Sequence, residues 1–380
     1  MKNNNKLSTG SILAVIVMNA CIAIVTSQAS DQGQLTFKEL GQIDTGGITY
    51  RVEVIGGTAY IVDFQLGFKA FDVSNPRNPL ELDTLDHPNY YDPDVRGGHS
   101  LVIRDDTAIV DFTHGGIKIV NISDPTDLRE IGAFYISGVE YYGLIVNSDF
   151  VYTVIQHYDE RDELLIIDIS DITAPIEAGR YSNGHKIFIS YVYENIGYVY
   201  GEESGQLFCL DVTDPANVTE IGKIDWFPSW FLNDVEIIDS RVYVGTLSQG
   251  LRVYDMSDPL DPLLLGQYDS GYVLDIDIVG DLIFAALHDR GFKVFNASGT
   301  ELMEIGHFNN GGESLDVCVQ NGVAYVAEYS TGIEIIQIQG LLDGSSADTM
   351  VSPGFDLHFF VFLTIPCLVT IKWKRKKGVL

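Results

Sequence analysis

Cysteine is scarce in this chain, and the familiar catalytic signatures are missing altogether. Of its 4 cysteines, only Cys209 and Cys318 lie outside the terminal segments, which is too few for a disulfide framework. We therefore expect both to be small buried hydrophobic residues, and the fold to depend on its apolar core. No nucleophile elbow, metalloprotease helix, phosphate-binding loop or EF-hand loop occurs in the sequence. Function must then be sought in the fold and its surfaces.

Basic residues are also scarce. Lys and Arg number 23 against 53 Asp and Glu, which gives a formal net charge of −30. Leaving out the basic residues of 1–30 and 372–377, and Asp356, 16 basic residues face 52 acidic ones, a net charge of −36. A domain this acidic does not bind nucleic acid or an anionic membrane surface through its charge. It suits cations, basic partners or simple solubility, and solubility is the plainest interpretation.

Helical periodicity is absent from the middle of the chain, where short alternating apolar runs occur instead. Residues 235–271 show the unit, which has four such runs separated by polar turns, as expected for an antiparallel meander. A sequence marker ends the third run: several apolar residues, then Asp or Asn, a small residue and, in most copies, Asp-Pro. The marker or a degenerate form of it occurs seven times, at Asp72, Asn121, Asp168, Asp211, Asp255, Asn296 and Gln337.

The spacing of these markers predicts the architecture. Successive markers lie 49, 47, 43, 44, 41 and 41 residues apart, which is the period of a four-stranded propeller blade. Seven markers predict an all-β, seven-bladed β-propeller that occupies residues 31–342. The array of apolar run, Asp, Ser and Asp-Pro resembles the LVIVD-type repeat of secreted seven-bladed propellers over about residues 35–342. The resemblance implies antiparallel blades in an extracellular protein.

The fourth run of the unit predicts how the ring closes. Several units end on a pattern close to Glu-Ile-Gly-x-aromatic, as at residues 130–135, 220–225, 264–269 and 304–309. The last unit has no such run after Gln337, whereas residues 37–44 have this form and precede the first unit. We predict that residues 37–44 complete the last blade, residues 314–340, so that both ends of the domain join one sheet.

Both ends of the chain differ from the repeats. Residues 1–30 carry two lysines, an apolar run and a small polar end, the pattern of a secretory signal peptide. A linker at 343–354 precedes an apolar segment, 355–373, whose 19 residues would span about 28 Å as a helix, enough to cross a bilayer. The basic tail, 374–380, predicts that the propeller lies outside the cell.

The junction before this segment carries a second resemblance. Pro353, Gly354 and Phe355, followed by the apolar span and the basic tail, resemble the carboxy-terminal sorting signal of archaeal surface proteins. The resemblance implies cleavage and lipid attachment in place of a retained transmembrane helix. The long Thr-rich stalk that commonly precedes that signal is missing here.

Candidate ligand-binding residues gather at one end of the predicted ring. In a propeller, the loops from strand four to the next strand one share a face with the turns from strand two to strand three; we call it the loop face. Aromatic rings there can stack on sugar or peptide, and histidines can hydrogen-bond it. The alternative is that the loop tips are merely polar and that the aromatic side chains pack as wedges between neighbouring blades. The candidates on this face are Tyr90, Tyr91, His114, His157, His185, Trp226, Trp230 and His288, and His99, on a first strand that lines the channel, is a further candidate.

First strands line the central channel, and three of them repeat a carboxylate at one level. Asp234, Asp275 and Asp316 lie 41 residues apart on consecutive blades. A hard cation such as calcium prefers oxygen ligands, so a metal in the channel is one interpretation. The other is that each carboxylate accepts hydrogen bonds from backbone amides of the adjacent blade. No other cofactor is indicated.

Three asparagines match the glycosylation acceptor pattern. Asn121 and Asn296 stand at the marker position, where Asn replaces Asp, so they mostly report the fold. Asn217 lies in a loop from strand three to strand four and is the one good surface candidate.

Two classes of function remain. The first is a membrane-anchored, cell-surface binding module for an extracellular protein, peptide or glycan, expected to be a monomer. The second is a hydrolase or lyase at the channel mouth, which requires a His within reach of a carboxylate and a pocket. Binding is favoured because the chain lacks a recognisable catalytic set, although fold alone does not determine function.

Overall fold

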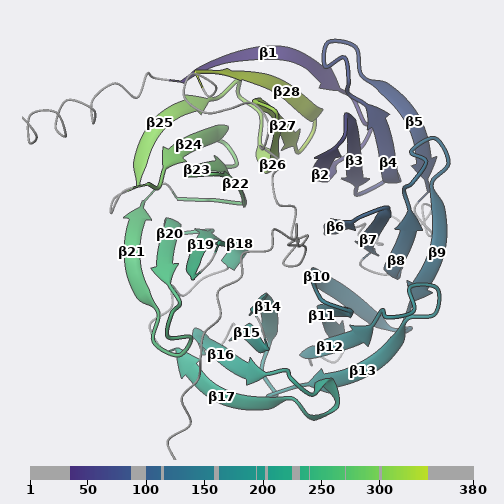
Figure 1. Cartoon of the computed structure of the whole chain (residues 1–380), viewed down its shortest axis with the longest axis vertical. Helices are drawn as coiled ribbons and strands as arrows, with labels where there is room; N and C mark the ends of the chain where they lie inside the picture. The colour runs from purple at the N-terminus through teal and green to yellow at the C-terminus, as the bar shows by residue number, and fades with distance from the viewer. Residues whose placement is uncertain are drawn as a thin grey trace, which may run out of the picture.

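The computed structural model describes residues 35–86, 100–112, 115–157, 162–193, 195–201, 204–224, 232–238, 240–269, 271–298 and 302–340. These residues form seven four-stranded antiparallel sheets, arranged as blades around a common centre (Figure 1); we keep the name channel for the region that the first strands enclose. The prediction of an all-β, seven-bladed propeller is therefore confirmed. In this part of the chain the only helical element is the 3-10 turn Pro215–Asn217.

Each blade is a meander whose first strand lines the channel and whose fourth strand forms the outer rim (Figure 1). Blade 1 contains β2 (Thr49–Ile55), β3 (Thr58–Asp63), β4 (Gly67–Asp72) and β5 (Leu80–Leu85). Blade 2 contains β6 (Leu101–Arg104), β7 (Thr107–Phe112), β8 (Gly116–Asn121) and β9 (Arg129–Phe134). Blade 3 contains β10 (Val139–Asn147), β11 (Phe150–His157), β12 (Asp162–Asp168) and β13 (Ile176–Tyr181).

The remaining blades continue in the same order around the ring. Blade 4 contains β14 (Ile187–Tyr193), β15 (Ile196–Gly201), β16 (Gln206–Asp211) and β17 (Thr219–Ile224). Blade 5 contains β18 (Leu232–Ile238), β19 (Arg241–Thr246), β20 (Gly250–Asp255) and β21 (Leu263–Tyr268). Blade 6 contains β22 (Asp275–Val279), β23 (Leu282–Ala286), β24 (Phe292–Asn296) and β25 (Met303–Phe308). Blade 7 contains β26 (Ser314–Gln320), β27 (Val323–Glu328), β28 (Gly332–Gln339) and β1 (Thr36–Ile43).

Strand β1 closes the ring as predicted. It pairs antiparallel with β28, with Phe37 opposite Ile338 and Ile43 opposite Ile333, and Figure 1 shows it outside β28 at the rim. The Leu35 backbone N–H also donates to the Ile305 carbonyl of blade 6 at 3.3 Å. The segment 35–43 therefore completes the last blade and ties it to blade 6.

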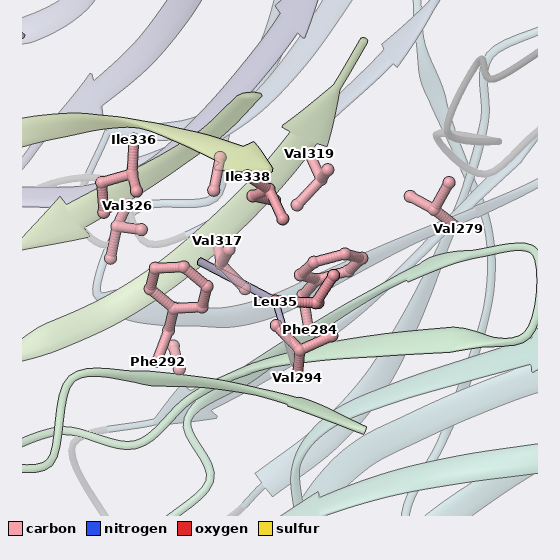
Figure 2. Close-up of a cluster of buried hydrophobic side chains, with 12 residues drawn as sticks. Leu35, Val279, Phe284, Phe292, Val294, Val317, Val319, Val326, Ile336 and Ile338 are labelled. Atoms are coloured by element: carbon pink, nitrogen blue, oxygen red, sulfur yellow. The ribbon is translucent and has the colours of Figure 1, made fainter. Parts of the chain in front are cut away.

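The core is divided among the seven junctions between blades. Alternating residues of each strand face one neighbour or the other, so each buried cluster contains side chains of two adjacent blades. Figure 2 shows the cluster between blades 6 and 7, where Phe284 and Phe292 lie near Val317 and Ile336. Burial on both faces explains why the inner strands read as nearly continuous apolar runs. Cys209 and Cys318 are free and buried in such clusters, as expected.

The sequence marker and the Glu-Ile-Gly pattern meet at the rim. The marker Asp folds its own corner, as where Asp211 Oδ1 accepts the Thr213 N–H at 2.9 Å. The corner then packs on the glycine in the fourth strand of the preceding blade. A Cβ on Gly179 would lie 1.7 Å from the Pro215 carbonyl oxygen, and one on Gly132 would lie 1.9 Å from that of Ile172. Only a hydrogen fits between these blades.

The terminal predictions fall outside the described residues. The signal segment 1–30, the linker 343–354, the membrane segment 355–373 and the tail 374–380 all lie there. Within the described residues, no helix is long and apolar enough to cross a membrane.

Candidate functional site

Three of the predicted ligand-binding residues can be placed, and all three lie on the loop face. His157 ends β11, His185 lies between β13 and β14, and His288 lies in the turn between β23 and β24. The other predicted residues lie outside the described part of the chain; they are Tyr90, Tyr91, His99, His114, Trp226 and Trp230.

His157 belongs to an ion-pair network on blade 3. Its Nε2 lies 3.2 Å from Glu163 Oε2, and Arg180 Nη1 lies 2.8 Å from the same oxygen. Partial burial favours a higher pKa for Glu163, but hydrogen bonds from Arg180 and His157 outweigh it and hold the pKa below its usual value. The carboxylate therefore stays ionised at neutral pH and is shared between His157 and Arg180, which also binds Glu177. This pair places a His within reach of a carboxylate, which is one of the two requirements of the enzyme alternative.

His288 connects blades 6 and 7 on the same face. Its backbone exchanges hydrogen bonds with Ser314, at 3.1 and 3.0 Å, and it holds a left-handed φ of 50°. Its ring centroid lies 6.1 Å from that of Tyr272, and its Nε2 lies 3.9 Å from Glu313. The backbone bridge thus fixes an imidazole and a tyrosine side by side at the surface.

Exposed aromatic residues are confined to the loop face within the described residues. Tyr135 is 59% exposed, Tyr272 55% and Tyr329 41%, and every other described Phe, Tyr or Trp side chain is buried or half-buried. Tyr135 follows β9, Tyr272 precedes β22, and Tyr329 lies in the turn between β27 and β28. The sequence interpretation missed all three, because their exposure depends on which loop residues neighbouring blades cover.

The channel carboxylates bind the backbone of the next blade. Asp234 accepts the Ile276 N–H at 3.1 Å, Asp275 the Val317 N–H at 3.0 Å, and Asp316 the Val52 N–H at 2.7 Å. Each first strand is thereby fastened to the following one across blades 5, 6, 7 and 1. These contacts are the ones expected if the repeated aspartates accept hydrogen bonds from the backbone of the adjacent blade.

A single arginine stands among these carboxylates. Arg51 Nη1 donates to Asp316 Oδ1 at 2.5 Å and also to Asp275 Oδ1. One level further down, burial and the nearby charges of Asp316 and Asp277 raise the pKa of Glu53 to about 8. Glu53 is therefore mostly protonated at neutral pH, and the channel carries less negative charge than its carboxyl count suggests.

The described residues do not assemble a metal site. They contain no group of three His, Cys, Asp or Glu side chains that could hold a metal ion. The oxygens of Asp234, Asp275 and Asp316 are already engaged by amides and, for two of them, by Arg51. Calcium at these residues stays an untested prediction.

The channel wall has two unlike sides. The first strands can be compared at the register position of Glu53, which pairs with Tyr60 of β3. At that position the first strands of blades 2, 3 and 4 carry Val102, Ile145 and Tyr191. Blades 5 and 6 present Glu236 and Asp277 there. At this level blades 5, 6 and 1 therefore present acidic groups, blade 7 presents Cys318, and blades 2 to 4 present apolar or aromatic groups.

Comparison with known proteins agrees with this architecture. The model of the LVIVD repeat matches residues 46–86, 144–183 and 233–270, which correspond closely to blades 1, 3 and 5. The chain is thus a seven-bladed propeller that carries LVIVD repeats. No curated protein matches its sequence.

Solved structures show the same fold at low sequence identity. The WD40 propeller domain of Doa1 superposes with a TM-score of 0.60 and 10% identity, over 79% of this chain and 97% of that one. The Neurospora crassa Pan2 WD40 domain gives 0.59 and 9%, over 83% and 97%. The computationally designed Ika8 protein gives 0.56 and 11%, over 79% and 99%. These similarities concern the fold alone.

Proposed function

We propose that this protein is a cell-surface binding module, anchored through residues 355–373, whose loop face captures an extracellular protein, peptide or glycan. The propeller fold and its LVIVD repeats suggest an interaction module as the class of function. The observation that carries the choice of face is the confinement of the exposed tyrosines Tyr135, Tyr272 and Tyr329 to it.

An exposed tyrosine is suited to recognition because it offers a large, rigid and amphipathic surface at a low entropic cost. The exposed large hydrophobic side chains of the outer rim are non-aromatic instead, as with Leu80, Ile176 and Met303. The sequence also assigns Tyr90, Tyr91, Trp226 and Trp230 to loops of the same face. The exposed tyrosines and these predicted loop residues therefore favour the same face.

The net charge of the protein limits the kinds of ligand that we expect. The ring is strongly acidic, since the whole chain has a formal net charge of −30. Long-range attraction favours the approach of basic ligands and opposes anionic ones. We therefore favour a protein or peptide with basic side chains, or a neutral glycan, over an anionic glycan.

The experiment is a protein and glycan array probed with residues 31–342. A variant with Tyr135, Tyr272 and Tyr329 changed to Ala is expected to bind its ligand at least about tenfold more weakly, because exposed aromatic anchors dominate such interfaces. The matched control changes Leu80, Ile176 and Met303 to Ala, which are 55%, 61% and 55% exposed on the rim. Loss of binding in the rim variant, with the loop-face variant intact, would refute the choice of face.

Anchoring has its own test. Protease added to intact cells should remove the propeller, and deletion of residues 355–380 should release it into the medium. A propeller that resists protease until the cells are lysed would contradict an extracellular location.

A further inference from the structure

The outer strand of blade 5 departs from the rule that the other outer strands follow. At one register position, just before the bulge, six outer strands carry glutamate, and Leu264 of β21 takes that place. Glu130 lies opposite Val120 in blade 2, Leu264 opposite Tyr254 in blade 5, and Glu304 opposite Phe295 in blade 6. The six glutamates are Glu39, Glu81, Glu130, Glu177, Glu220 and Glu304.

In blades 1, 2 and 6 this glutamate binds a lysine on the third strand of its own blade. Lys118 Nζ lies 3.0 Å from Glu130, and Lys293 Nζ lies 2.8 Å from Glu304. Arg252 has the equivalent position on β20, opposite Gln267. With leucine on the outer strand, Arg252 binds Asp269 instead, at 2.6 Å. Blade 5 has therefore kept the cation and lost the partner that charges the rim.

What replaces the glutamate is an apolar edge. Leu263 is 64% exposed, Leu264 41% and Leu265 36%, and Leu260 just before them is 43% exposed. Strand β21 contains no charged residue, whereas each of the other six outer strands contains at least one. Charged side chains on an edge strand normally prevent it from pairing with another chain.

The charge of the protein indicates what covers this edge. Two copies of a chain with a formal net charge of −30 repel each other, and six of the seven rims would bring glutamates face to face. At β21 two copies meet without opposing carboxylates. A basic partner would gain more from the six glutamate-bearing rims, so the absence of charge favours a second copy.

We propose that β21 is the self-association surface of this protein, where Leu263, Leu264 and Leu265 of two copies pack together across a two-fold axis. Such an interface uses the same patch on both copies, so a single apolar edge is enough to form a closed dimer. This dimer leaves the loop faces of both copies free. It differs from the monomer that the sequence led us to expect. The proposal does not depend on the ligand of the loop face.

Restoring the repeat gives the sharpest test. Leu264→Glu places a glutamate next to Arg252, as the lysine-bearing blades 1, 2 and 6 do, so the ring should remain folded and equally stable. Light scattering on the membrane-extracted protein, corrected for bound detergent, should give the wild type twice the protein mass of Leu264→Glu. The matched control is Ile176→Glu on β13, which is 61% exposed and should stay dimeric. A monomeric wild type, or a dimer unaffected by Leu264→Glu, would overturn the proposal.

Cross-linking on membranes provides a second measurement. Leu264→Cys treated with a short bis-maleimide should give a covalent dimer on a denaturing gel, because Cys209 and Cys318 are buried. Ile176→Cys and the wild type carry the same remaining cysteines and should give none beyond the background. Equal cross-linking of Leu264→Cys and Ile176→Cys would also overturn the proposal.

Discussion

Gly179 and Gly222 occupy equivalent positions in β13 and β17, yet alanine should affect them very differently. A Cβ on Gly179 would lie 1.7 Å from the carbonyl oxygen and 2.5 Å from the carbonyl carbon of Pro215. A Cβ on Gly222 would meet the Leu260 Cδ2 atom at 2.8 Å, the far end of a side chain that is 43% exposed. Neither glycine has a positive φ, so steric contact alone separates the two variants.

The sizes of the two effects follow from what must move. For Gly179→Ala the blade 4 corner must retreat by more than 1 Å, and rigid overpacking of this kind costs about 3 kcal/mol of unfolding free energy. For Gly222→Ala the leucine can rotate into solvent. The smaller entropy of the unfolded chain then returns about 0.4–1 kcal/mol, so the net change should be near zero.

Urea unfolding of residues 31–342 measures the difference. The two variants should unfold with the same dependence on urea, and Gly179→Ala should unfold at a clearly lower urea concentration. Equal midpoints for Gly179→Ala and Gly222→Ala would show that the corners do not lock the blades together.

Three further outcomes are expected. Burial raises the pKa of Glu328 to about 7 from 4.5, so the free energy of unfolding should fall by about 3 kcal/mol as pH rises from 4.5 to 7 and then level off. Glu328→Gln should reduce this fall. If the variant and the wild type show the same dependence of unfolding free energy on pH, the prediction is wrong. Deleting residues 35–43 should strongly lower the midpoint of thermal unfolding, because β28 loses its partner; an unchanged midpoint would contradict ring closure by β1. In a host that glycosylates Asn-X-Ser/Thr sites, Asn217→Gln should remove the glycan mass, because Asn217 is exposed whereas Asn121 and Asn296 hold their own corners; loss of that mass only with Asn296→Gln would contradict the assignment.

The fold was predictable because each blade repeats the same sequence pattern. A marker such as Asp211 folds the corner, and a glycine such as Gly179 receives the next one, so one period reports both strand order and blade number. Residues 37–44 could be assigned to the last blade because one fourth strand was missing there.

The site was less predictable because it depends on distances between blades. The sequence favoured a backbone amide over a metal as the partner of Asp316 but could not identify that amide, and the structure places the Val52 N–H at 2.7 Å. The exposure of Tyr272 depends on how blades 6 and 7 pack around His288. The loss of glutamate at Leu264 was visible in the repeat, but its meaning required the ion pairs of the other blades.

The unfolding of Trp226→Ala and Trp230→Ala tests most directly whether the long loops of the loop face form a recognition surface. If these side chains are available to a ligand, each variant should lie within about 1 kcal/mol of the wild type in unfolding free energy, the range for exposed positions. Phe292→Ala, in the core between blades 6 and 7, is the reference for a buried aromatic residue and should cost about 3–5 kcal/mol. If the tryptophan variants lose as much stability as Phe292→Ala, these side chains are wedges between blades, and the account of the loop face is contradicted.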